Sequence, residues 1–487
     1  MVECVSFYDH NVSGLARLQK RIFEKLGISL KQIRTDLIDG KGAAHAGALD
    51  SLIGSSAARV FVIFDVDAFL LSISYYQELV DSALRGELSG IAQSMDWTRT
   101  GNIYIGPACI AFSRETFDRL DRPSFYPCRI ATDVGEEFTL RAREKNVPIN
   151  FAWPTHVAKK RWRMRDTWMG SGITCEGKVF HGFESGKGGT GAESFLDAAY
   201  AFLGETRPDL SIVTTCMNRL SFLKDSLPRW HAWLETSGKR GEIVLADWSC
   251  PENSGAWLEG AHPAAVVVRS PGQKFYTQSG ACNLAAGAAT GRILGIVDGD
   301  VSPTPRTGEL FDMLDPERFH RIDRTNFPAA FGLLGSCFVP RRAWATCGGY
   351  DEVIRNYGHV DDDFYETLTF MGFLDTLVSP ELLKHAHHNN EMRTAFFEEK
   401  TIGVSSVYNT TYSRIKQDVM RINRRCLSRE ERVQLKDAVD QAINTFQATG
   451  NAEFAAFEFD PIMTWLPYYI GRTLSYTLDL SKKLEFR

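Results

Sequence analysis

The sequence predicts an α/β protein with two domains, each built on a doubly wound and largely parallel sheet, followed by a helical C-terminal extension. Three observations carry this prediction. β-branched runs alternate with helix-like segments, an acidic pair ends an apolar run in each half, and the two halves repeat one order of features. At 487 residues the chain is long enough for two or three separate cores. We expect domains at 1–205 and 206–400 and the extension at 401–487.

Strands and helices alternate through the second half of the chain. Strands are expected at 211–215, 242–246, 264–269 and in the run that ends at Asp298, and helices at 220–230 and 279–289. In such a fold, ligands bind at the carboxyl ends of the strands. Asp247, Asp298 and Asp300 all stand at such ends, so they are candidate ligand-binding residues.

Four features of the second half recur in the first half in the same order. They are a small-residue helix (43–49 and 279–289), an acidic pair, an apolar run (106–112 and 335–339) and an acidic helix start (133–138 and 361–365). Histidine comes last, as His181 in the first half and as His385, His387 and His388 in the second. A recurring order of this kind indicates a tandem duplication of one fold.

The acidic pairs Asp65–Asp67 and Asp298–Asp300 indicate a metal. Two carboxylates one residue apart at a strand's end repel each other and lose hydration unless a cation joins them. A hard divalent ion such as Mg²⁺ or Mn²⁺ is the natural partner of oxygen ligands that also hold phosphate. The sequence therefore predicts metal–phosphate chemistry at two places.

Composition argues against several classes of protein. A net charge of −5 disfavours nucleic acid as a partner, because nucleic-acid-binding proteins present a basic surface. No apolar run approaches the roughly 20 residues of a membrane span, and the first residues lack the features of a signal peptide. The ten cysteines are scattered, which favours a reduced, cytoplasmic setting. In the glycine-rich connector at 184–191, Lys187 is followed by glycine, so a P-loop is not expected.

The C-terminal extension is expected to be helical. Ser428 and Glu431 have the spacing of a capping box that starts a helix. The aromatic segment 465–470 has two interpretations, packing on the second domain or peripheral contact with the inner face of a membrane.

Residues 209–395 resemble glycosyltransferases of the GT-A fold, in particular family-two and galactosyltransferase-like enzymes. The resemblance rests on five motifs in family order: Ser211–Arg219, Asp247–Ser249, Asn283–Asp300, Gly348–Glu352 and Gly358–Phe364. It implies tandem GT-A-like domains, which have the Rossmann-like fold of a nucleotide-diphospho-sugar transferase. It also implies a nucleotide-sugar donor, with UDP as the expected nucleotide.

The resemblance implies a role for each matching residue. The residues around the nucleotide are Thr215, Arg219, Asp247, Asn283 and Asp298. Asp298 and Asp300 form the DxD motif that holds Mn²⁺ or Mg²⁺ across the two phosphates, with Asp300 as the direct ligand. His385 or His387 supplies the last metal ligand.

The acidic cluster that follows is expected to supply the catalytic base. Asp361 stands where galactosyltransferase-like enzymes keep the base that deprotonates the acceptor hydroxyl, which gives inversion at the anomeric carbon. The family commonly has Glu before this Asp, whereas this chain has Val360, so the choice between Asp361 and Asp362 stays open. A solvated acidic helix start without a catalytic role is the alternative.

The first domain has two candidate families. The run from Phe64 to Leu71 is similar to the aspartate loop of haloacid-dehalogenase phosphatases, but the Gly-Thr of that loop is missing. A second GT-A domain fits the preceding small-residue helix better. By analogy with the second half, metal would bind at Asp65, Asp67 and His181, and the acceptor would face Glu136 or Glu137. A degenerate domain that only supports its neighbour or binds glycan would keep the same fold.

The sequence thus predicts a metal-dependent glycosyltransferase that moves a sugar from a nucleotide donor to a saccharide or glycolipid acceptor, in the synthesis of a surface polysaccharide. Two modules would make the chain bifunctional, with one site per domain and inversion in the second. One alternative is a single active transferase at 206–400 beside an inactive first domain. Another, of a different class, is a glycan-binding protein without catalysis.

Overall fold

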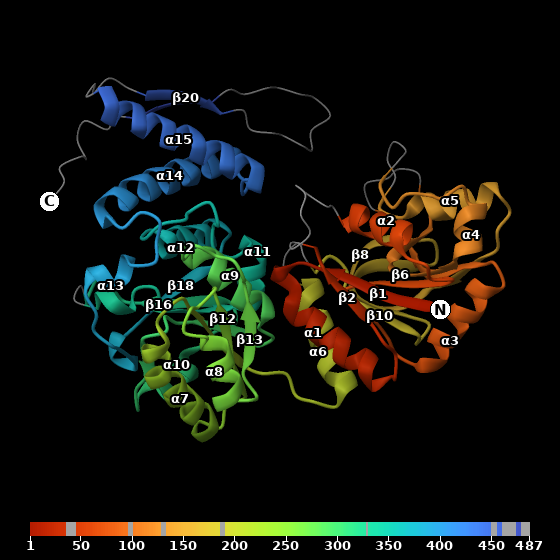
Figure 1. The fold of residues 1–487 in the computed structure, drawn as a ribbon, viewed down its shortest axis with the longest axis horizontal. Coiled ribbons are helices and arrows are strands. Elements are labelled where there is room, and N and C mark those ends of the chain that lie inside the picture. The colour runs from red at the N-terminus through yellow and green to blue at the C-terminus, as the bar shows by residue number, and fades with distance from the viewer. Residues whose placement is uncertain are drawn as a thin grey trace. The chain divides into compact units, whose positions relative to one another are not determined.

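The structure is a computed structural model that describes residues 1–35, 45–95, 101–127, 133–185, 190–327, 330–449, 455–459 and 474–478 (Figure 1). The chain divides into two compact units. Unit 1 comprises Met1–Ser211 and Ala286–Arg292, and unit 2 comprises Ile212–Ala285 and Ile293–Arg487. Within the described ranges, no helix is both long enough and apolar enough to serve as a membrane span.

Unit 1 is built on a six-stranded sheet in the order β2-β1-β3-β6-β5-β7. Its neighbours are parallel except around β6, which is antiparallel to both β3 and β5. All ten residues of β6 are buried, as expected for a central strand that is covered on both faces. The strands are β1 (Val2–Tyr8), β2 (Lys31–Arg34), β3 (Val60–Asp65), β5 (Leu88–Gln93), β6 (Tyr104–Ser113) and β7 (Ile149–Ala152).

Helices cover both faces of this sheet. Side chains of β3 alternate between two cores, because successive residues of a strand point to opposite faces. Val62 and Phe64 pack with α1, α3 and α6, whereas Phe61 and Ile63 pack with α2 and α5. The helices of unit 1 are α1 (Ser13–Lys25), α2 (His45–Ser55), α3 (Ile73–Leu84), α4 (Arg114–Arg119), α5 (Glu136–Glu144) and α6 (Thr190–Leu203). Unit 1 is therefore a three-layer α/β fold.

A second, antiparallel sheet of unit 1 has the order β4-β10-β9-β8. Its strands are β4 (Ala68–Leu70), β8 (Pro154–Met164), β9 (Thr167–Cys175) and β10 (Val179–His181). The strand β4 begins directly after Asp67, and its partner β10 ends at His181. This small sheet thus joins two segments that the sequence predicts to share a site.

Unit 2 is built on a seven-stranded sheet in the order β13-β12-β11-β14-β17-β16-β18. The strand β17 is antiparallel to both β14 and β16, and β16 is parallel to β18. A separate antiparallel pair joins β15 to β19. The strands are β11 (Leu210–Cys216), β12 (Gly241–Asp247), β13 (Val266–Arg269), β14 (Ile293–Ile296), β15 (Val301–Pro303), β16 (Arg318–Ile322), β17 (Cys337–Pro340), β18 (Leu374–Val378) and β19 (Leu383–His385).

The helices of unit 2 follow the expected alternation. The predicted helices at 220–230 and 279–289 correspond to α7 and α9. Those that precede the C-terminal extension are α7 (Leu220–Thr236), α8 (Ser254–Ala261), α9 (Gln278–Ala288), α10 (Thr307–Met313), α11 (Arg341–Cys347), α12 (Val360–Phe370) and α13 (Asn390–Thr394).

The two units share a strand order. Without its edge strand β13, the sheet of unit 2 matches that of unit 1 position by position, including the central antiparallel strand, β6 or β17. The short pair β4–β10 likewise has a counterpart in β15–β19. One connection differs: β8 and β9 lie between β7 and β10, whereas only a short 3-10 helix, η4 (Pro380–Leu382), lies between β18 and β19.

The C-terminal extension is helical only in part. The helices α14 (Ile402–Asn423) and α15 (Arg429–Thr449) pack together, as the blue ribbons of Figure 1 show. The predicted capping box is confirmed, because Ser428 N donates to Glu431 Oε2 at 2.7 Å and Glu431 N donates to Ser428 Oγ at 3.2 Å.

The all-helical expectation for the extension is wrong after α15. There, β20 (Ala455–Phe459) pairs with β21 (Leu474–Leu478) in an antiparallel hairpin. Aromatic residues recur at every second position of β20, a period that suits a strand rather than a helix. The segment 465–470 and residues 186–189 of the expected connector lie outside the described residues.

A buried ionic network joins α14 and α15 to the acidic helix α12. Lys416 Nζ of α14 pairs with the carboxylates of Asp363 and, at 3.0 Å, Asp351. Arg432 Nη1 of α15 lies 2.9 Å from Asp351 Oδ1. Burial alone would lower the pKa of Lys416, but the two carboxylates raise it above its ordinary value. The charges of the network therefore depend on one another.

We expect Lys416→Met to destabilise the protein by about 3–5 kcal/mol, because two buried carboxylates would lose their shared cation. The free energy of unfolding in urea measures this loss. Lys224→Met changes an exposed lysine of α7 and is the control, with an expected change within about 0.5 kcal/mol. Equal effects of the two substitutions would contradict the assignment.

Candidate active site

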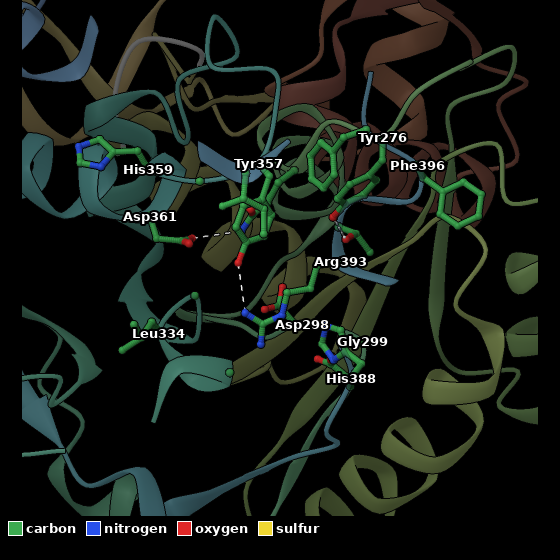
Figure 2. A pocket seen from close by; sticks show the side chains of 18 of the residues that line it. Tyr276, Asp298, Gly299, Leu334, Tyr357, His359, Asp361, His388, Arg393 and Phe396 are labelled. Atoms are coloured by element: carbon green, nitrogen blue, oxygen red, sulfur yellow. Dashed lines mark hydrogen bonds and ion pairs between the residues drawn. The ribbon is translucent and has the colours of Figure 1, made fainter. Parts of the chain in front are cut away.

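Unit 2 contains a cavity of about 370 Å³ at the carboxyl ends of β11 and β14. Figure 2 shows Asp298, Asp361 and His388 on its walls. The start of α12, the segment around β19 and the first turns of α14 also line it. The cavity thus lies where a doubly wound sheet binds its ligands.

Asp300 and two histidines form a compact group in this cavity. His388 Nδ1 lies 3.0 Å and His385 Nε2 lies 3.3 Å from Asp300 Oδ2. The pairing of β15 with β19 places Val301 opposite His385, which brings that histidine beside the acidic pair. One ligand atom from each of the three residues lies within 4.8 Å of the others. The fold, not the local sequence, therefore assembles this group.

The group has the properties of a metal site. Asp300 Oδ1 is buried and accepts no hydrogen bond within the described part of the chain. Burial lowers the pKa of His388, so its imidazole is neutral and able to act as a ligand at neutral pH. One carboxylate and two imidazoles are a suitable ligand set for a divalent transition metal, Mn²⁺ among them.

Asp298 lies in the same cavity, where Asp300 and Asp361 are neighbouring carboxylates. Burial, followed by the charges of Asp300 and Asp361, raises the pKa of Asp298 to about 7. A Cβ atom added to Gly335 would lie 3.3 Å from Oδ2 of both Asp298 and Asp361, so the two carboxylates converge on a position without a side chain. A bound cation would relieve this repulsion.

Asp361 is the second residue of the helix α12 and faces the cavity (Figure 2). Its Oδ1 accepts hydrogen bonds from Tyr350 OH at 3.0 Å and from Gln278 Nε2 at 3.2 Å. Burial raises the pKa of Asp361 to about 6, although the Tyr350 bond opposes the rise. The helix starts after His359, whose φ of 70° is in the left-handed region. A carboxylate with one bonded and one further oxygen, and a pKa near neutrality, suits a general base.

The two aspartates after Asp361 lie in different surroundings. Asp362 has 43% of its side chain exposed, and its Oδ1 lies 3.1 Å from Arg324 Nη1. Asp363 is buried and pairs with Lys416. Of the three consecutive aspartates, Asp361 is the one held by neutral donors at the cavity wall.

Besides Asp298, two residues predicted to bind the nucleotide line the cavity. Thr215 Oγ1 lies 2.6 Å from Tyr276 OH. Arg219 Nη2 donates to Met392 O at 2.8 Å, which ties the end of β11 to the segment after β19.

Asp247 and Asn283 instead lie behind the cavity wall. Asp247 is buried and accepts from the backbone N–H groups of Cys250 and Gly255, both at 2.8 Å. Asn283 exchanges hydrogen bonds with the backbone of Tyr350, each at 2.9 Å. Neither residue lines the cavity, so their contacts position the loops that do.

The histidine segment departs from the sequence prediction at one residue. His387 is exposed, and His388 lies beside Asp300, where His387 was expected. After β19 ends at His385, the chain turns, so strand alternation no longer indicates which side chain points inward. Tyr276, Gln278 and Tyr350 were missed as site residues, although Tyr350 falls within a motif that the sequence highlights.

A similar group occurs in unit 1. One ligand atom each from Asp65, Asp67 and His181 lies within 4.8 Å of the others. His181 Nε2 lies 3.4 Å from Asp67 Oδ1, and the β4–β10 register places His181 opposite Ala68. Gln19 donates to Asp65 O and Ala68 O, both at 2.7 Å, and so holds the turn that carries the acidic pair.

The glutamates predicted to face an acceptor in unit 1 are both buried and bonded. Glu136 accepts from Asn102 Nδ2 and from Asp133 N, both at 3.0 Å. Glu137 accepts from Arg141 Nε at 2.8 Å. Both glutamates at the start of α5 are thus hydrogen-bonded to neighbouring groups of unit 1, whereas Asp361 at the start of α12 lines a cavity.

No family model and no curated protein matches the chain. Among solved structures, the mannosyltransferase PcManGT from Pyrobaculum calidifontis in complex with GDP-Man and Mn²⁺ matches 54% of this chain and 84% of its own, at 14% identity and a TM-score of 0.34. S. aureus TarS matches 50% and 75%, at 11% identity and 0.35. A Drosophila β1,4-galactosyltransferase 7 mutant with manganese, UDP-Gal and xylobiose matches 39% and 75%, at 14% identity and 0.29. The chain is thus similar to solved glycosyltransferases over part of its length.

We expect His388→Ala to weaken Mn²⁺ binding at least about tenfold and the matched control His387→Ala to leave it unchanged, because His388 lies beside Asp300 and His387 is exposed. Titration calorimetry should be performed in a chain that carries Asp67→Ala, so that a single candidate cluster remains. Loss of binding in the His387 variant alone would restore the interpretation from sequence.

Proposed function

We propose that unit 2 transfers a sugar from a nucleotide donor, expected to be UDP-linked, to a saccharide or glycolipid acceptor in the synthesis of a surface polysaccharide. One observation carries the proposal: a metal-type group of Asp300, His385 and His388 shares a cavity with Asp361, a partly buried carboxylate whose pKa is raised to about 6. Direct displacement at a sugar's anomeric carbon needs these two parts, a site for the departing diphosphate and a base for the incoming hydroxyl.

The residues divide the work by position. Asp298, Asp300, His385 and His388 would hold a divalent ion, which neutralises the charge that builds up on the departing diphosphate. Asp361 accepts the proton of the acceptor hydroxyl while the hydroxyl oxygen attacks the anomeric carbon. The bond from that carbon to the diphosphate breaks on the opposite side, so the configuration of the carbon is inverted. Tyr350 and Gln278 hold one oxygen of Asp361 and so orient the other.

The nucleotide would lie along the wall formed by β11. Thr215 and Arg219 line the cavity there and are offered as its direct contacts. Asp247 and Asn283, which the family resemblance assigns to the nucleotide, are assigned a supporting role here, because their polar atoms already bind backbone groups. The nine cysteines described are free thiols, which fits a reducing, cytoplasmic setting for the reaction.

The function is tested by screening nucleotide sugars for metal-dependent release of a nucleoside diphosphate. A glycosyltransferase releases the diphosphate with Mn²⁺ and stops in excess chelator. Asp300→Ala should abolish the release while the protein stays folded. A glycan-binding protein without catalysis would bind saccharide and release none, and that result would overturn the proposal.

We expect Asp361→Asn to lower kcat by a factor on the order of 10² to 10⁴ with little change in donor affinity, because the base touches only the acceptor. The activity of the unchanged enzyme should fall as pH drops through about 6, where the carboxylate of Asp361 takes up a proton. Rates of diphosphate release across pH measure both effects.

Asp362→Asn is the matched control for Asp361→Asn, since it makes the same change one residue away at a half-exposed position. It should leave kcat within a few-fold of the original. A crippling Asp362→Asn with a benign Asp361→Asn would move the base by one residue.

Unit 1 is proposed to carry a second transfer site, which would make the chain bifunctional. The supporting observation is the group of Asp65, Asp67 and His181, held on the β4–β10 pair as Asp300 and His385 are held on β15–β19. The competing proposal is that unit 1 is a scaffold without a transfer site. The hydrogen bonds that Glu136 and Glu137 accept support it, because both glutamates at the start of α5 are engaged by other groups.

With two independent sites, Asp67→Ala should stop one transfer and leave the Asp300-dependent transfer intact, so that product stops after a single sugar. Titration calorimetry with a nucleoside diphosphate and Mn²⁺ should then find two sites, each lost with its own aspartate. A single site that disappears entirely with Asp300→Ala would make unit 1 a scaffold.

A further inference from the structure

The hairpin of β8 and β9 is the part of unit 1 without a counterpart in unit 2. It occupies residues 153–178, between β7 and β10, where unit 2 has only the short connection 379–382. The strand β9 pairs with β10, whose last residue is His181 of the candidate metal group. The hairpin therefore extends the small sheet that carries this group.

The hairpin is strongly basic on its exposed surface. Lys159, Lys160, Arg163 and Arg165 are exposed, and within the described ranges none of them pairs with a carboxylate. Arg161, also exposed, pairs with Glu184. The protein as a whole has a net charge of −5, so this concentration of positive charge is a local feature. Unpaired positive charges on β8 and on its turn into β9 form a site for anions.

Indole rings lie beneath these cations. Lys160 Nζ lies 5.6 Å from the ring centre of Trp168, whose side chain is 38% exposed. The register pairs Arg163 with Trp168, so a second cationic residue stands directly opposite the residue that carries this ring. Arg165 stacks over Trp153 at 5.5 Å. An exposed aromatic face between cations offers a stacking surface together with charge.

A chain of aromatic contacts connects the hairpin to the metal group. The ring of Trp162 lies 5.6 Å from that of Phe183, and Phe183 lies 5.7 Å from His181. Trp162 Nε1 also donates to Ser94 Oγ at 3.2 Å, which anchors β8 to the main body of unit 1. A ligand bound along the hairpin would thus be held on a platform that is packed against the metal group.

We propose that the β8–β9 hairpin binds an acidic saccharide chain, one that carries carboxylate or other anionic groups on its sugars. Lysine and arginine side chains meet the anionic groups, and the indole face of Trp168 stacks on a sugar ring. The inference deepens the proposed function by naming the acceptor class, and it rests on that function only for the choice of a saccharide.

Two other occupants fit the hairpin less well. Insertion into a membrane surface needs an apolar tip, whereas the turn between β8 and β9 is Arg165-Asp166. Nucleic acid is disfavoured by the negative charge of the rest of the protein. Lysines also protect an edge strand such as β8 from pairing with other chains, but that role does not require the exposed Trp168.

The test is titration calorimetry of the full chain with a hexamer of galacturonic acid, and with maltohexaose as the neutral probe of equal length. We expect the acidic probe to bind and the neutral one not to bind. Lys159→Gln with Lys160→Gln should weaken the acidic probe about tenfold and reduce the salt dependence of binding. Trp168→Ala should weaken it by a similar factor at any salt concentration.

The matched control is Lys20→Gln with Lys224→Gln, which removes two exposed lysines outside the hairpin and should leave binding unchanged. Equal binding of both hexamers, or no binding of the acidic one, would overturn the proposal. So would tighter binding to vesicles of equal parts phosphatidylcholine and phosphatidylserine, or to an oligothymidylate. Diphosphate release from a nucleotide sugar without acidic-probe binding would overturn this inference and leave the proposed function standing.

Discussion

The gathering of the carboxylates of Asp298, Asp300 and Asp361 around one cavity is the constraint on which the rest of unit 2 depends. Neighbouring ionised carboxylates repel one another, and burial together with the charges of Asp300 and Asp361 raises the pKa of Asp298 to about 7. The β15–β19 pair places two histidines at Asp300, and Tyr350 and Gln278 hold Asp361. The Oδ2 atoms of Asp298 and Asp361 converge near Gly335, and Asp300 Oδ1 accepts no hydrogen bond from the described residues, an arrangement that a divalent cation would stabilise.

The two units show how the same topology can treat an acidic helix start differently. In unit 2 the left-handed His359 turns the chain so that Asp361 faces the cavity and Asp363 faces Lys416. In unit 1 the left-handed Gly135 precedes Glu136 and Glu137, which bind backbone and side-chain donors of their own neighbourhood. The metal-type groups are alike, whereas the acidic helix starts are not, so a transfer reaction in unit 1 would need a base other than the glutamates of α5.

Much of this organisation could be predicted from sequence, because it follows from local patterns. Apolar runs that end in acidic pairs predicted β3 and β14, and the capping box predicted the start of α15. The choice between His387 and His388 depends on how the chain turns after β19, which no periodicity encodes. The burial of Asn283 behind Tyr350 depends on contacts between distant segments, and so it could not be predicted from either segment alone.

The network around Lys416 has a consequence for where this molecule can be divided. Sequence patterns suggest a boundary near residue 400, yet α14 supplies Ile402, Ser406 and Thr410 to the cavity wall. A protein truncated at that point would keep every acidic residue of the site and lose the cations that neutralise Asp351 and Asp363. The shortest segment that keeps this site intact therefore includes both α14 and α15. Recombination or proteolysis before α14 would separate Asp351 and Asp363 from Lys416 and Arg432, the cations that neutralise them.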